Sequence, residues 1–179
     1  MKPILAVPML AFALLAGTAT AQDASSYPSS PDLIQPATVT DPQEFATKAG
    51  GAGLFEVQTS QLALTKSQNA DIQAFAQMMI DDHTKAGEAL KTAAGAQQAI
   101  SVPTDMDAAS AAKFAQLNDA SGADFDKLYV QMQTDAHVEA VGLFSGYAAN
   151  GAAGALKDFA AQTLPTLKMH YEHVLALKA

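Results

Sequence analysis

Four side chains in this sequence are of types that could bind one metal ion together: Glu56, His83, His137 and His170. Each lies in a different stretch with the apolar periodicity of a long helix, on or beside the stripe that would be buried. Imidazole with one carboxylate is a ligand set suited to zinc, copper, iron or nickel. His173 follows His170 by three residues and could reach the same ion. Near the end of its helix, it could instead be a surface residue that offsets the helix dipole.

The alternative to a metal site is a polar core, in which a buried Glu56–His83 hydrogen-bonded pair fixes the register of two helices. Heights along the helices favour this alternative. A first loop centred at about residue 68 places Glu56 opposite about residue 80, roughly one turn from His83. A last loop centred at about residue 150 leaves His137 nearly two turns from His170. We therefore expect a Glu56–His83 pair, a separate His170 region and a peripheral His137, rather than one compact site.

Two segments precede the helices that would position these residues. Residues 1–21 contain Lys2, an apolar run and the small-residue motif Ala19-Thr20-Ala21, a pattern that predicts a secretory signal peptide. Residues 22–40 are rich in Ser and Pro and are expected to be a flexible leader. Residues 41–179 are then one helical domain. The chain is expected to be exported, to the periplasm in a Gram-negative bacterium or fully out of the cell.

The apolar periodicity predicts long helices at about residues 41–67, 69–97, 121–150 and 152–178. Asp41-Pro42 is a start signal for the first long helix, and Ser121 is a start signal for the third long helix. The pair Asn150-Gly151 is suited to the left-handed backbone conformation that often follows a helix. The connection at residues 99–120 contains a short helix expected to start at Thr104. This connection could cross the whole bundle, so the third long helix could run parallel or antiparallel to the second. Pro165 lies inside the fourth long helix and should kink that helix.

Composition excludes several classes of function. Removal of residues 1–21 takes away Lys2 and no acid, which leaves a net charge of 9 − 18 = −9, and the sequence contains no Arg. Such a chain is poorly suited to nucleic acid or anionic lipid. It contains no Cys, which excludes disulfides, thiolate metal ligands and a lipoprotein anchor. After the signal segment, no run approaches the roughly 20 apolar residues of a membrane span.

Four runs of residues occur in the same order in one bacterial family: Glu56–Ala63, Phe75–His83, Ser121–Asp126 and Phe159–His170. Through them the chain resembles, over about Pro42 to Leu177, the exported proteins grouped as domain-of-unknown-function family 4142 and often labelled predicted outer membrane protein. The resemblance implies an all-α fold, a ferritin-like four-helix bundle with a short extra helix in the connection between the second and third long helices. It implies little about activity.

Ferritin-like di-iron proteins take one Glu from each of two helices and a Glu-x-x-His pair from each of the others. In this sequence the residues three positions before the histidines are not carboxylates: Ile80, Thr134 and Leu167 precede His83, His137 and His170. We therefore do not expect carboxylate-bridged di-iron chemistry or iron storage.

Three functions remain open from the sequence. The favoured one is a non-enzymatic exported protein with an envelope or stress role and an unidentified protein partner, since no nucleophile–base pair or phosphate loop assigns a catalytic residue. The first alternative is a metal-binding or metal-buffering protein with a single transition-metal ion at the Glu/His residues. The methionines Met78, Met79, Met132 and Met169 would then offer soft contacts to copper. The second alternative is a metal-dependent oxidoreductase with Glu56 as a base.

Overall fold

The computed structural model describes residues 26–97 and 100–179, and all regular secondary structure within them is helical. The long helices are α1 (Pro42–Lys66), α2 (Ala70–Gly95), α4 (Gly122–Asn150) and α5 (Ala155–Ala176). A short helix, α3 (Ala108–Asp119), lies between α2 and α4, and a 3-10 turn spans Pro31–Leu33. The prediction of an all-helical chain with a short extra helix is confirmed, whereas the expected signal peptide lies outside the described residues.

Short polar side chains set where most of these helices begin. The Asp41 carboxylate accepts from the backbone N–H of Glu44 at 2.7 Å, as the start signal predicted. In α3 the N-cap is Asp107, whose carboxylate accepts from the N–H groups of Ala109 and Ser110 at 2.8 and 2.9 Å. The short helix therefore begins at residue 108, later than the predicted Thr104.

The ends of α4 differ from the prediction. Ser121 makes no side-chain capping bond, and the next residue, Gly122, has a positive φ of 58°. At the other end Gly151 is extended, with φ −63°, rather than left-handed. The positive φ of that loop, 145°, is at Gly154. The loop therefore covers residues 151–154, and α5 begins at residue 155, three residues later than expected.

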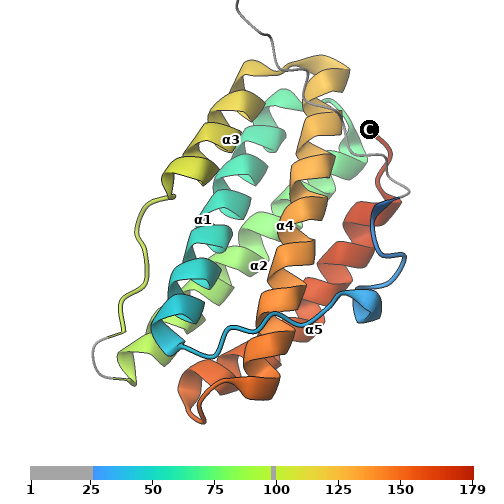
Figure 1. Ribbon diagram of the computed structural model, residues 1–179. Helices are drawn as coiled ribbons and strands as arrows, with labels where there is room; N and C mark the ends of the chain where they lie inside the picture. The colour runs from blue at the N-terminus through green and yellow to red at the C-terminus, as the bar shows by residue number, and fades with distance from the viewer. Residues whose placement is uncertain (1–25, 98–99) are drawn as a thin grey trace, which may run out of the picture.

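Neighbouring long helices in the bundle are antiparallel (Figure 1). The Lys66 ammonium at the end of α1 contacts the carbonyls of Asn118 and Ala120, just before α4, and the Asn69 side chain before α2 donates to the carbonyl of Lys178 at 2.9 Å. One end of the bundle thus contains the end of α1, the start of α2, the start of α4 and the end of α5. Consequently α4 runs parallel to α2, the crossover alternative of the two that the sequence left open.

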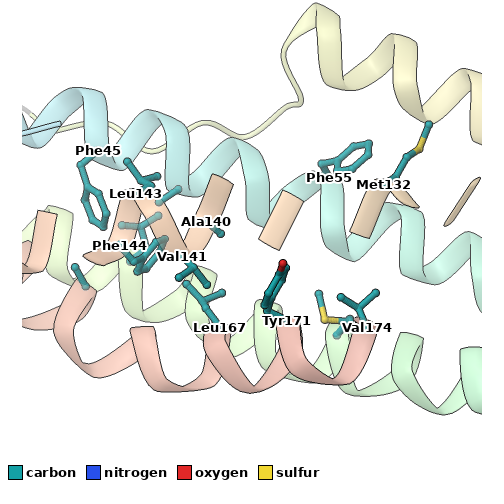
Figure 2. Close-up of a cluster of buried hydrophobic side chains, with 14 of the residues drawn as sticks. Phe45, Phe55, Met132, Ala140, Val141, Leu143, Phe144, Leu167, Tyr171 and Val174 are labelled. Atoms are coloured by element: carbon teal, nitrogen blue, oxygen red, sulfur yellow. The ribbon is translucent and has the colours of Figure 1, made fainter. Parts of the chain in front are cut away.

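Aromatic clusters fill both ends of the core. Figure 2 shows Phe45 of α1 beside Leu143 and Phe144 of α4. The Phe45 ring also stacks on Tyr147, with centroids 4.0 Å apart. Towards the other end, Phe75, Phe125 and Tyr129 are all fully buried. Each such side chain contributes about 1.5–3 kcal/mol by leaving water.

The segment before α1 packs against α4 and α5, and we call residues 27–40 the N-terminal strap. The N–H of Ala37 donates to the carbonyl of Gly142 at 2.8 Å, and the Tyr171 hydroxyl donates to the carbonyl of Pro28 at 2.7 Å. A Cβ added at Gly146 would overlap the carbonyl oxygen of Ala37. The expectation of a flexible leader is wrong for these residues, because small residues on α4 let the strap backbone approach closely.

Candidate metal centre

The four candidate residues meet in the middle of the bundle. Their side chains are almost fully buried, with 1% exposure for Glu56, 7% for His83, 0% for His137 and 1% for His170. One ring nitrogen from each histidine lies within 4.8 Å of the others. The expectation of a separate His170 region and a peripheral His137 is wrong, because His137 is fully buried and the three histidines form one group. Glu56 lies beside this group rather than within it.

The predicted positions of these residues along the bundle axis were inaccurate for two physical reasons. The α4–α5 loop covers residues 151–154, so its centre lies near residue 152.5 and His137 faces about residue 168, only two positions from His170. In addition, every Cα–Cβ bond tilts towards the N-terminus of its own helix. In each antiparallel pair, Glu56 with His83 and His137 with His170, this tilt brings the two side chains towards each other. It closes offsets of about 3 to 4.5 Å along the bundle axis.

The Glu56 carboxylate anchors His83. Its Oε2 lies 3.0 Å from Nδ1 of His83, and its Oε1 lies 3.6 Å from Nδ1 of His137. Because an ionised carboxylate only accepts, Nδ1 of His83 is the donor and carries the ring proton. The predicted facing pair of Glu56 and His83 is therefore present.

The other two histidines have acceptors of their own. Nδ1 of His137 lies 2.8 Å from the backbone carbonyl of Gln133, one turn earlier in α4. Nε2 of His170 lies 3.0 Å from Oδ2 of Asp82 on α2. A carbonyl and a carboxylate oxygen can only accept, so these two ring nitrogens are also donors.

The second ring nitrogen of each histidine has no hydrogen-bond partner, although it is buried. These atoms are Nε2 of His83, Nε2 of His137 and Nδ1 of His170. When a ring is neutral, its proton sits on the anchored nitrogen, and the second nitrogen then holds a free lone pair. Three histidines on three helices, each with one ring nitrogen anchored by a hydrogen bond and the other without a partner, match the pattern of metal-binding histidines.

Burial and charge set the protonation states. Burial alone would raise the pKa of Glu56, but the imidazoles of His83 and His137 lower it below its ordinary value. Burial would likewise lower the pKa of His83, yet the adjacent Glu56 carboxylate raises it. A metal ion at His83 therefore competes with a proton that Glu56 favours.

The remaining two imidazoles are held neutral. Burial lowers the pKa of His137 to about 4, with the charge of His83 acting in the same direction. Burial, together with His83, also lowers the pKa of His170 despite its contact with Asp82. At neutral pH both rings therefore present a lone pair instead of a second proton.

His173 does not join the other histidines. It is exposed in the last turn of α5, and its ring packs edge-on against Phe75 with centroids 5.3 Å apart. Among the methionines, Met79 belongs to the apolar core and Met169 is 46% exposed. Pro165 lies inside α5 on its exposed face, five residues before His170.

Sequence reasoning missed two groups that hold the histidines. Asp82, to which the sequence analysis assigned no role, is half-buried and reaches His170 across the α2–α5 contact. Its position next to His83 was a weak signal, since adjacent helical residues point in different directions and Thr84, on the other side of His83, is exposed. The Gln133 carbonyl carried no signal at all, because every helical residue has one.

The fold and this cluster define a helical bundle with three convergent histidines in its core. The chain belongs to the family described as Domain of unknown function (DUF4142), which matches residues 28–177. The match begins within the N-terminal strap, in agreement with the packing of that segment on α4 and α5. No curated protein and no solved structure matches this sequence.

Proposed function

We propose that this protein binds one divalent transition-metal ion through Nε2 of His83, Nε2 of His137 and Nδ1 of His170. The observation that carries the proposal is the set of three buried, unpartnered nitrogens, each opposite an anchored N–H. Among the described residues, this is the group of potential ligands that lies close enough for one ion.

A polar core without a metal ion accounts for fewer of the buried nitrogens than a metal site does. A register-fixing pair needs only Glu56 and His83, whereas each further buried nitrogen without a partner costs about 1–3 kcal/mol. An ion would use all three lone pairs. Bonds of about 2.0–2.1 Å in a tetrahedral site place ligand nitrogens about 3.3 Å apart, so the rings would need to close by on the order of 1 Å from the present arrangement.

The chemistry of the site favours zinc, copper or nickel over a di-iron centre. Three neutral imidazoles leave a coordination position for water or another small ligand. Glu56 has its Oε2 engaged by His83 and would act as the outer partner that orients this ligand. No carboxylate joins the histidine group in the described part of the chain.

We further propose a ferritin-like fold and a role outside the cytoplasm. The parallel course of α2 and α4, joined by a long crossover that includes α3, supports the first. The signal-peptide pattern of residues 1–21 supports the second. An exported bundle of this kind would bind or buffer a metal ion, rather than serve only as a partner-binding envelope protein.

The test is metal binding by residues 22–179, purified without an affinity tag. Zinc, copper(II) and nickel(II) are titrated separately while thermal unfolding and bound metal are measured. We expect one ion per chain. At a free ion concentration about 100 times Kd, the ion should raise the free energy of unfolding by about 2.7 kcal/mol. His137→Ala and His170→Ala should abolish the shift.

His173→Ala is the matched control, because His173 lies in the same helix as His170 but is exposed and outside the cluster. It should bind metal like the parent protein. The proposal is wrong if none of the three ions binds, or if binding survives both core substitutions.

A further inference from the structure

A cavity of about 330 Å³ lies next to the histidine cluster, between α1 and α2. Its walls include Leu54, Val57 and Leu90, and its deeper side reaches Phe144 and Leu167 of α4 and α5. Figure 2 shows that Phe144 and Leu167 belong to the packed core. The walls are therefore apolar over most of the depth. The volume is about twice the ~150 Å³ that suffices for benzene in a protein core.

Two polar side chains, Glu56 and His83, line the inner end of this cavity. Both are more than nine-tenths buried, and each has an atom without a hydrogen-bond partner, Oε1 of Glu56 and Nε2 of His83. Glu56, which lines this apolar cavity and has an oxygen without a partner, therefore offers an acceptor that a bound molecule can satisfy.

The outer end of the cavity reaches solvent. Exposed Glu88 and Lys91 of α2 line it together with the crossover residues Val102 and Pro103. The crossover is held there by close packing on Gly50, where an added Cβ would lie 2.8 Å from Val102 and 2.9 Å from Pro103. The cavity is therefore open to solvent on the α2 side.

Glycine keeps the cavity wide. Gly53 and Gly87 line it, and a Cβ added at either would meet no atom within 4 Å. Space of this kind inside a helical bundle is uncommon, because cores are otherwise packed to the density of organic crystals. The two positions also allow the cavity to be filled without disturbance of its walls.

We propose that this cavity binds a neutral apolar molecule of about ten to fifteen non-hydrogen atoms whose single hydroxyl group, phenolic or alcoholic, donates to Oε1 of Glu56. A carboxylate would be repelled by Glu56 and by the acidic chain, which has a net charge of −8. An ammonium group would lose its hydration among apolar walls. A hydroxyl loses less hydration and supplies the missing donor.

The test uses the metal-free protein, so its outcome is independent of the metal proposal. Residues 22–179 are titrated calorimetrically with 4-propylphenol and with 4-propylanisole, the methyl ether that cannot donate. We expect one phenol per chain, with Kd between about 10 µM and 1 mM. The ether should bind at least about fivefold more weakly, because Glu56 is then left without a donor.

Gly53→Leu places an isobutyl group in the cavity and should weaken phenol binding at least about tenfold. The control is Gly95→Leu, which adds the same side chain at an exposed helical glycine that also has open space but lies outside the cavity. It should change Kd by less than about twofold. Thermal melting verifies that both variants fold.

The absence of saturable binding of the phenol to the parent protein would overturn the proposal. Equal affinities for phenol and ether would overturn the assignment of Glu56 as the acceptor. Unchanged phenol binding by folded Gly53→Leu would overturn the assignment of the cavity.

Discussion

At the scale of single residues, each buried histidine uses one ring nitrogen to hold its orientation and keeps the other free. The three acceptors that hold them are the Glu56 carboxylate, the Gln133 carbonyl and the Asp82 carboxylate. Of these three, only the Asp82 carboxylate is half-exposed, so removal of Asp82 should not leave a buried charge unpaired. Replacement of Asp82 therefore tests whether its contact with His170 supports a metal site or is purely structural.

Replacement of Asp82 should weaken metal binding with little change in folding. Asp82→Ala removes the acceptor that fixes the tautomer of His170, and loss of such a partner typically lowers metal affinity by about 10- to 100-fold. Competition with a chelator of known affinity measures the change.

The neighbouring Asp81→Ala is the control, because Asp81 is exposed and accepts from the Gln77 side chain instead. It should leave the affinity within about twofold. Equal losses in both variants would mean that general charge, rather than the contact with His170, accounts for the effect.

The buried neutral state of His137 predicts a pH dependence of stability. Burial lowers its pKa in the folded protein to about 4, whereas the ordinary value is 6.5. Above about pH 6.5 both the folded and unfolded states hold the ring neutral, so its contribution is complete. As the pH falls from about 6.5 towards 4, only the unfolded state takes up the proton, and stability decreases by about 2 kcal/mol at pH 5.

Denaturant unfolding of the metal-free protein at pH 7 and pH 5 measures this loss. His137→Gln lacks the titrating group but retains the other ionisable residues, so the loss between the two pH values should be smaller in the variant. An identical loss in both proteins would contradict the depressed pKa.

At the scale of elements, close approach of backbone to helix determines how the N-terminal strap lies. The strap crosses α4 where Gly142 and Gly146 leave room, and a Cβ at Gly142 would already lie 3.1 Å from the carbonyl oxygen of Gln35. The strap covers the part of α4 that follows His137.

Gly146→Ala should destabilise the protein, because the added methyl group overlaps the carbonyl of Ala37 and forces strap and helix apart. We expect a loss of about 1–3 kcal/mol in the free energy of unfolding, the usual range for overpacking. Urea denaturation is the measurement.

Gly51→Ala serves as the comparison, since a Cβ at this helical position meets nothing within 4 Å. It should instead stabilise the protein by about 0.5–1 kcal/mol through helix propensity alone. If Gly146→Ala behaves in the same way, the strap does not rest on α4 as described.

At the scale of the whole molecule, the described residues form one acidic helical domain. No helix within residues 26–97 and 100–179 is long and apolar enough to cross a membrane. The N-terminal strap ends at α1, close to the crossover, where Gln43 accepts from the N–H of Ser101 at 2.9 Å. The expected signal segment precedes the strap.

Export predicts a defined mature N-terminus. Expression of residues 1–179 in a Gram-negative host should yield protein outside the cytoplasm that begins at Gln22, because Ala19 and Ala21 satisfy the small-x-small cleavage pattern. Cell fractionation followed by intact mass measurement determines the compartment and the first residue of the mature protein. Ala19→Lys should block cleavage, whereas Thr20→Lys, at the unrestricted middle position, should not. Full-length protein in the cytoplasm would contradict the prediction.

The sequence by itself determined the helices and which residues they bury. Apolar periodicity and the Asp41-Pro42 start placed the long helices within a few residues, since these signals depend on neighbours one or two turns away. It also placed Glu56, His83 and His170 on buried stripes. The start of α3 and the extended conformation of Gly151 were missed, because side-chain caps and loop conformations compete locally at nearly equal energy.

Only the tertiary structure decided that the histidines meet. Their heights depend on the length of the 151–154 loop, on the antiparallel direction of each neighbouring pair and on the tilt of side chains towards each helix N-terminus. None of these is a property of a single helix. The anchoring contacts of Asp82 and the Gln133 carbonyl, and the cavity beside Glu56, likewise arise from distant segments packed together. Periodicity is local, whereas the convergence of three lone pairs depends on how whole helices are placed in space.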